Sequence, residues 1–84
     1  MIFGERVAIG RETVIALGEA AKDYEGSYIQ ADDGITITFN TPHGKHTEMK
    51  IPAKMLPSDE YVKDIFIAHH IRKAVRKMKE NNHE

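Results

Sequence analysis

The longest periodic pattern of hydrophobic residues lies in the last third of the chain, from Ser58 to about Glu80. Its apolar positions recur three or four residues apart, which keeps them within roughly 140° of a helix surface. This spacing predicts one long helix with an apolar stripe, made of Tyr61, Ile65, Ala68, Ile71, Val75 and Met78. Ser58 suits the N-cap position, and Asp59 and Glu60 suit the first turn, where carboxylates interact favourably with the helix dipole.

A shorter helix is predicted from Arg11 to Tyr24, directly after Gly10. Its apolar face is expected to consist of Val14, Leu17, Ala21 and Tyr24. The small residues Gly18 and Ala21 predict a close approach of this helix to a neighbouring backbone. Gly26 suits the end of the helix because glycine tolerates a positive φ.

The middle of the chain alternates apolar and polar residues, which predicts strands over Tyr28–Ala31, Ile35–Asn40 and His46–Ile51. Asp33-Gly34 favours a tight hairpin turn between the first two strands. A second turn is predicted over Thr41–Lys45, and Pro52 is expected to end the last strand.

The alternation assigns each face of this sheet. The face predicted to be buried carries Ile35, Ile37, Phe39, Thr47, Met49 and Ile51. The face predicted to be open to solvent carries Thr36, Thr38, Asn40, His46, Glu48 and Lys50. A short apolar segment at the N-terminus adds a possible edge strand, formed by Ile2, Phe3, Val7 and Ile9.

These elements predict an α+β fold, a two-layer sandwich with the order (β)-α-β-β-β-α. An antiparallel three-stranded meander packs both helices, including the long C-terminal one, on its apolar face. At 84 residues the chain is expected to form a single domain over residues 1–84, with residues 80–84 as a frayed tail.

The order helix, three strands, helix resembles that of double-stranded RNA-binding domains, which recognise duplex RNA by shape and phosphate contacts. Such domains carry a lysine cluster where the last helix begins. Here that position is the acidic Ser58-Asp59-Glu60, and the basic residues lie at the far end of the helix. The resemblance is therefore one of topology, and no family is assigned.

Composition restricts the classes of function. The chain has no cysteine, which excludes disulfides, thiolate metal sites and cysteine nucleophiles. Residues 1–11 contain charges and no long apolar run, so neither a signal peptide nor a membrane span is predicted, and the expected location is cytoplasmic. The formal net charge of −1 predicts weak long-range attraction to nucleic acid or to an anionic membrane.

The charges are nevertheless distributed unevenly. The charged residues between positions 12 and 33 are all acidic except Lys22, and the end of the long helix carries a basic cluster of Arg72, Lys73, Arg76, Lys77 and Lys79. One interpretation is a solvated helix end, because cations complement the dipole there. The other is a surface that contacts nucleic acid, an acidic protein, a phosphorylated ligand or the acidic region of a second copy.

Val62 and Phe66 lie away from the apolar stripe in the helical projection. If one sheet alone packs against the helix, both side chains are exposed and form a partner-binding patch. If the first helix or the N-terminal segment covers them, they belong to the core. The predicted partner-binding residues are Val62, Phe66, His69, His70, Lys73 and Lys77.

Motifs for chemistry are weak. His43, His46, His69 and His70 bind a metal only if turn and helix converge, and adjacent histidines on a helix point about 100° apart, so no metal site is predicted. Asp64 is expected to be partly buried, with Arg11 or Lys50 as a candidate partner. No catalytic residue, nucleotide fingerprint or cofactor is predicted.

The function predicted from the sequence is a small non-enzymatic binding protein that docks on another protein, as an inhibitor or adaptor, and associates with itself as a homodimer or larger. Its size and charge resemble those of small accessory proteins of bacteria and phages. The alternative is a binder of nucleic acid or of an anionic nucleotide that uses the basic cluster.

Overall fold

The computed structural model describes residues 9–31, 34–40 and 46–81 of the chain. Two helices and three strands follow in the predicted order, so the α+β fold class is confirmed. Their bounds are α1 Arg11–Asp23, β1 Tyr28–Ala31, β2 Gly34–Asn40, β3 His46–Pro52 and α2 Glu60–Asn81, with a short 3₁₀ turn, η1, at Ala53–Met55. The predicted N-terminal strand, the Asp32–Asp33 part of the hairpin turn, the Thr41–Lys45 turn and residues 82–84 lie outside the described residues.

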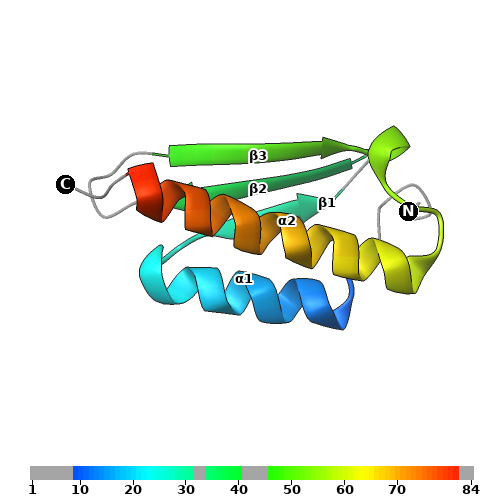
Figure 1. Cartoon of the computed structure of the whole chain (residues 1–84), viewed down its shortest axis with the longest axis horizontal. Coiled ribbons are helices and arrows are strands. Elements are labelled where there is room, and N and C mark those ends of the chain that lie inside the picture. Colours follow the sequence, from blue (N-terminus) through cyan, green and yellow to red (C-terminus); the bar gives the residue numbers. More distant parts are fainter. Residues whose placement is uncertain (1–8, 32–33, 41–45, 82–84) are drawn as a thin grey trace, which may run out of the picture.

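The three strands form an antiparallel sheet in the order β1-β2-β3, and both helices cover the same face of it (Figure 1). The register places Ile29 opposite Ile37, and Ile37 opposite Met49. A second apolar row is Ala31, Ile35 and Ile51. These rows all point toward the helices, so the predicted alternation of faces is confirmed. Thr47, opposite Phe39, lies on the same inner face but is exposed and not buried as predicted.

The hydrophobic core lies between this sheet face and the two helices. Ile37, Phe39, Ile67 and Ile71 are fully inaccessible to solvent. The ring of Tyr24, at the end of α1, packs edge-on against Phe39 with centroids 6.4 Å apart. A large side chain such as Phe39 contributes several kcal/mol when it is buried in this way, so this region anchors the fold.

The buried face of α1 differs from the predicted one. Thr13, Ala16 and Ala20 are buried, whereas Val14 is 58% exposed. Small side chains face α2 because the two helices contact each other directly beside the sheet. The close approach is made by Ala16 and Ala20, and not by the predicted residues: Ala21 is half-buried, and a Cβ on Gly18 would meet open space.

The apolar stripe of α2 is also rotated from its predicted position. Ala68, Ile71 and Met78 are buried as expected, but Tyr61 is 71% exposed and Ile65 is 43% exposed. Asp64 and Ile67 occupy the buried positions of the first turns instead. The reason is that α1 begins opposite Asp64, so Tyr61 lies before any part of α1 that covers it.

The start of α2 is one residue later than predicted. Asp59, and not Ser58, is the N-cap residue, because its carboxylate accepts a hydrogen bond from the Val62 amide at 3.0 Å. The Asp59 carbonyl accepts the first helical bond from the Lys63 amide at 2.8 Å. The acidic charge expected in this turn is therefore present and caps the helix.

One residue of the open sheet face is not open. Thr38 was predicted to face solvent but is 5% exposed. It lies on the central strand, directly between Tyr28 of β1 and Glu48 of β3. The long side chains of these two neighbours shield the small threonine, which explains the difference.

Candidate functional site

The two helices are joined by a buried carboxylate. Asp64 of α2 accepts hydrogen bonds from the backbone amides of Glu12 and Thr13 at 2.8 Å each, and from the Thr13 hydroxyl at 2.7 Å. Asp64 thus caps the N-terminus of α1, whose own N-cap residue, Gly10, has no side chain. A Cβ on Gly10 would lie 2.6 Å from both carboxylate oxygens, so this contact requires glycine.

The environment of the Asp64 carboxylate indicates a structural role. Burial raises the pKa of its carboxyl, but the hydrogen bonds from the Thr13 hydroxyl and from the Glu12 and Thr13 amides outweigh this effect and hold the pKa below its ordinary value. Neither Arg11 nor Lys50, the partners expected from the sequence, contributes a bond. A carboxylate engaged by three donors and kept ionised is poorly suited to general acid or base chemistry.

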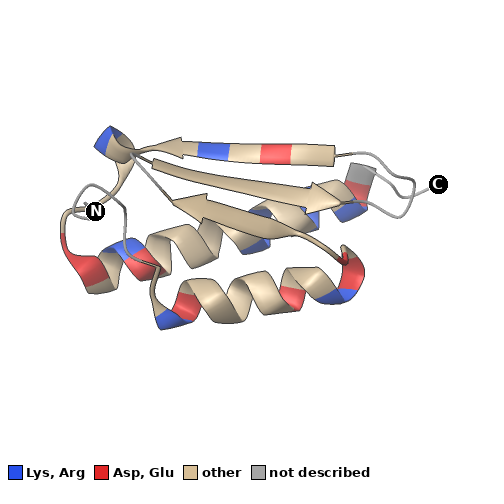
Figure 2. Ribbon diagram, turned by 180° about the vertical axis from the view of Figure 1, so that it is seen from behind, with Lys and Arg blue, Asp and Glu red and all other residues tan. Residues whose placement is uncertain are grey.

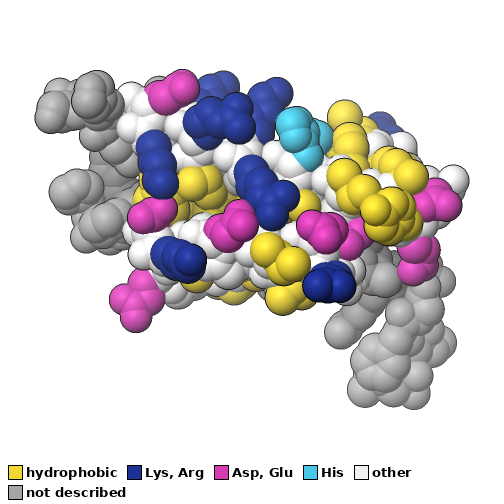
Figure 3. Space-filling view, turned by 60° about the horizontal axis from the view of Figure 1, so that its bottom comes forward, with side chains coloured by type: hydrophobic (Ala, Val, Ile, Leu, Met, Phe, Trp, Pro, Cys, Tyr) yellow, Lys and Arg dark blue, Asp and Glu magenta, His cyan; other side chains and the backbone are white. Residues whose placement is uncertain are grey.

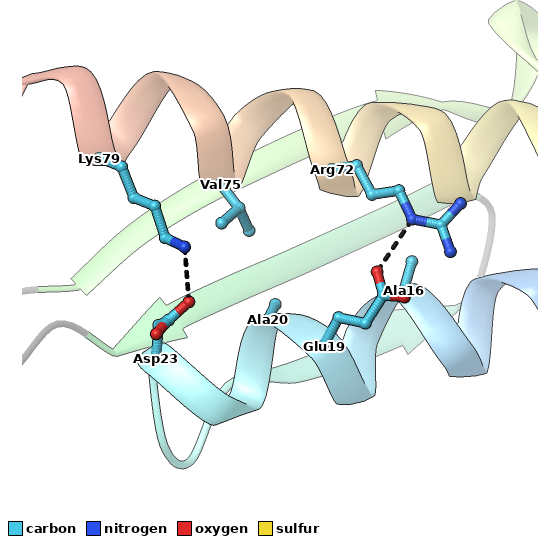
Figure 4. Close-up of a pocket in the computed structure, with 7 residues that line it drawn as sticks. All are labelled: Ala16, Glu19, Ala20, Asp23, Arg72, Val75 and Lys79. Carbon is cyan, nitrogen blue, oxygen red and sulfur yellow. Dashed lines mark hydrogen bonds and ion pairs between the residues drawn. The ribbon is translucent and has the colours of Figure 1, made fainter.

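A groove of about 180 Å³ lies between α1 and α2, further toward their C-termini (Figure 4). Its floor is formed by Ala16, Ala20 and Val75. Two ion pairs connect its walls, from α2 to α1: Arg72 Nε to Glu19 at 3.0 Å and Lys79 Nζ to Asp23 at 2.8 Å.

These pairs shift the titration of their members. The hydrogen bond from Arg72 holds the pKa of Glu19 below its usual range, and Glu19 in turn raises the pKa of Arg72. The hydrogen bond to Asp23 raises the pKa of Lys79. The acidic region of the sequence therefore meets the end of the basic helix within one chain, and two of the five cations of the predicted cluster are neutralised there.

The other three cations form a basic face on the outward side of α2, which consists of Lys73, Arg76 and Lys77. All three are exposed, and within the described part of the chain none of them forms an ion pair. The blue bands on this half of α2 and the alternating signs on α1 show the contrast between the two helices (Figure 2). This basic face is the part of the predicted cluster that is available to a ligand.

Hydrophobic side chains gather on the other half of α2 (Figure 3). We define the apolar patch as Tyr61, Val62 and Ile65, which are 71%, 49% and 43% exposed. Ile15 of α1, 40% exposed, adds a further apolar side chain to the helix layer. Of the patch, only Val62 was predicted as a contact residue; the exposure of Tyr61 and Ile65 was hidden by their fit to the helical stripe.

The predicted contact residues Phe66, His69 and His70 take different positions. Phe66 is half-buried and packs against the core, so the interpretation that the fold partly covers it is favoured. His70 stacks on the Phe66 ring with centroids 4.3 Å apart, and its Nδ1 donates to the Phe66 carbonyl at 3.0 Å. His69 is exposed and lies between the apolar patch and the basic face in the chain.

The described residues contain no group of three or more histidine, aspartate or glutamate side chains suited to holding a metal ion. His46 lies at the end of the sheet with its Nδ1 2.6 Å from Asn40 Oδ1. By the alternation of β2 and β3 it belongs to the sheet face opposite the helices, away from His69 and His70. His43 lies outside the described residues.

The pairing of Glu19 with Arg72 and of Asp23 with Lys79 was not visible in the sequence, because the partners are more than 50 residues apart. An indirect signal was present: acidic residues in the first helix and basic residues in the last, each at helical spacing. Only the parallel alignment of α1 and α2, fixed by Asp64, brings these particular side chains together.

None of the helices, over the residues that the structure describes, combines the length and the apolar character needed to cross a membrane. Comparison of the chain with protein-family models, with curated proteins and with solved structures finds no significant match.

Proposed function

We propose that this protein is a small non-enzymatic binding module that docks on another protein through the outward face of α2. The observation that carries the proposal is the apolar patch of Tyr61, Val62 and Ile65, three large exposed side chains on adjacent turns of a helix whose opposite side packs in the core. Contiguous exposed apolar side chains with polar surroundings are typical of interaction surfaces.

The size of the patch limits what it contributes. Full burial of one such side chain is worth roughly 1.5–3 kcal/mol, and these are already partly buried, so each contributes about 1 kcal/mol on binding. A micromolar complex requires about 8 kcal/mol. The contact must therefore extend along α2 to the basic face, where Lys73, Arg76 and Lys77 favour a partner with acidic residues beside its apolar ones.

The proposal is tested by photo-crosslinking in cells that encode the protein, with Val62 replaced by a photo-crosslinking amino acid. The matched control carries the same group at Gln30, an exposed position on the opposite face of the molecule. We expect discrete protein adducts from position 62, few from position 30, and loss of the adducts when Ile65→Lys is added. Equal adducts from both positions, or none from position 62, would contradict the proposal.

A second candidate function, nucleic-acid binding, is favoured by one observation: the three cations of the basic face are exposed and unpaired among the described residues. Arg72 and Lys79 argue against it, because their charges are already paired with Glu19 and Asp23. Three phosphate contacts would give a salt dependence of about −2.7 in log–log slope on duplex DNA, which implies weak binding at physiological salt.

Duplex binding by fluorescence anisotropy between roughly 50 and 500 mM salt separates the two functions. We expect negligible binding near 150 mM salt. The double variant Glu19→Gln, Asp23→Asn frees two more cations and should bind duplex more tightly than the wild-type chain. If the wild-type chain binds duplex tightly and Arg76→Glu abolishes this binding, nucleic-acid binding is favoured over protein docking. The interhelical groove, at about 180 Å³, is smaller than typical ligand pockets of roughly 300–1,000 Å³, so a nucleotide is not favoured.

A further inference from the structure

The outward face of α2 changes character along the helix in a fixed order. It begins with the acidic N-cap residue Asp59, continues with the apolar patch, and ends with the basic face. His69 lies between the last two. Such an order, acidic then apolar then basic, is its own complement when a second copy of the helix runs in the opposite direction.

We propose that the partner of this face is a second copy of the chain, packed with its α2 antiparallel to the first. The inference rests on the proposed function, because it names the partner of the same surface. The assembly would be an isologous dimer in which the helix layers meet and the two sheets lie outside.

The charges select the antiparallel arrangement. With a twofold axis placed between Phe66 and His69, Val62 faces Lys73 of the second copy, and Asp59 faces Arg76 of the second copy. Each acidic start then meets a basic end, and this happens twice in the dimer. A parallel pair would instead place the two acidic starts together and the two basic faces together, which is repulsive.

The apolar side chains fit the same register. Ile65 lies near the axis in both copies, where it is most fully covered. Val62 packs against the aliphatic stem of Lys73 of the second copy, while the ammonium group remains in water. Because Ile15 of α1 is exposed on the same helix layer, it enlarges the apolar contact beyond a single helix pair.

The first test is the mass in solution, measured by light scattering and sedimentation from roughly 5 to 500 µM, together with changes of charge. The start variant is Asp59→Asn, which removes the acidic charge of the face and retains an N-cap side chain. The end variant is Arg76→Glu with Lys77→Glu. We expect the wild-type chain to dimerise, each variant alone to dimerise about tenfold more weakly or worse, and their mixture to form a heterodimer.

The mixture is informative because the neutral start of one chain meets the reversed end of the other without repulsion, and the remaining unaltered start and end also meet. A matched control is Glu48→Lys, which reverses an exposed charge on the opposite face of the molecule and should leave the dimer unchanged. A dimer that persists unchanged in the start and end variants would overturn the inference.

A second test uses the absence of cysteine from the chain. Chains carrying Val62→Cys and Lys73→Cys are mixed and oxidised. In the antiparallel register these two positions face each other, whereas two copies of position 62 are separated by roughly 16 Å along the axis, at 1.5 Å per residue. A disulfide needs Cα atoms within about 7 Å, so we expect 62–73 bridges and few 62–62 bridges.

The outcomes separate this inference from the proposed function. A chain that remains monomeric at the highest concentration, or that forms mainly 62–62 bridges, would overturn the antiparallel dimer. If position 62 then still crosslinks to a different protein in cells, the docking function stands without the dimer. If position 62 crosslinks to nothing, both fail together.

Discussion

The contact between Asp64 and the first turn of α1 supplies the sharpest test of how the helices are held. Replacing Asp64 by Ala removes three hydrogen bonds to an ionised carboxylate. Thr13 is fully buried, so its amide is left without a partner, whereas its hydroxyl still donates to the backbone carbonyl of residue 64, 3.2 Å away. Glu12 is half-buried, so its amide gains water. With hydrogen bonds to charged groups worth about 1.5–3 kcal/mol, we expect Asp64→Ala to lower the free energy of unfolding by about 3 kcal/mol.

Gly10→Ala perturbs the same contact by adding a side chain next to the Asp64 carboxylate. Its Cβ would lie 2.6 Å from both carboxylate oxygens, so the carboxylate must move and lose part of its geometry. We expect a loss of about 2 kcal/mol for this change alone. In the double variant there is no carboxylate to displace, so the total loss should be about 3 kcal/mol rather than the sum of 5 kcal/mol.

Urea unfolding followed by circular dichroism measures all four chains of this cycle. The total stability of an 84-residue chain is roughly 4–13 kcal/mol at 0.05–0.15 kcal/mol per residue, so these losses are readily measured. A control cycle of Gly18→Ala with Asp64→Ala should be additive, because a Cβ on Gly18 meets nothing within 4 Å. If the effects of the Gly10 and Asp64 changes add to within about 0.5 kcal/mol, the proposed contact between these two residues is refuted.

The same carboxylate predicts a response to acid. The pKa of Asp64 is lower in the folded chain than in the unfolded chain, where it is near 3.9. Its contribution is therefore fully present above about pH 4 and is lost as the pH falls through the lower folded value. The stability of Asp64→Asn should fall less steeply than that of the wild-type chain over this acid range, and parallel curves would contradict the assignment.

The remaining predictions concern single positions whose roles differ from those suggested by the sequence. Val14→Ser should change the free energy of unfolding by less than about 0.5 kcal/mol, whereas Ile67→Ala should lower it by about 2–5 kcal/mol; equal effects in urea unfolding would contradict the observed rotation of the helices. Gly18→Ala should stabilise the chain by about 0.5–1 kcal/mol, because it removes a helix glycine and meets open space. Gly26→Ala should destabilise it by about 1–2 kcal/mol, because φ is 86° there and a Cβ would lie 2.9 Å from Asn40 Nδ2; a thermal melt that shifts both glycine variants in the same direction would refute this contrast.

The strands were predictable from the sequence because their side chains alternate with period two. The bounds Tyr28–Ala31 and His46–Ile51 agree with the structure to within one residue. Pairing in a meander is local, since each strand follows its neighbour within a few residues of the chain. Which sheet face is buried follows from the same alternation, with two departures. Thr38 is covered by its cross-strand neighbours, and Thr47 lies on the inner face but remains exposed.

The candidate binding surface was predicted only in part. Val62 and the cations Lys73 and Lys77 are exposed as expected, whereas Phe66 is half-buried. Tyr61 and Ile65 were assigned to the core because they fit the 3.6-residue period. A helical period defines which residues share a stripe, but it does not define how much of the stripe is covered. Tyr61 fits the stripe but lies before the part of α2 that α1 covers.

The sequence by itself determined the elements, their order and the inward face of the sheet, because each depends on the spacing of residues close together in the chain. Only the tertiary structure decided how each helix is rotated and which charges are available. That choice depends on Asp64 reaching the first turn of α1 about fifty residues earlier, which sets the two helices parallel and in register. The same register pairs Glu19 with Arg72 and Asp23 with Lys79, and leaves the apolar patch and the basic face of α2 exposed.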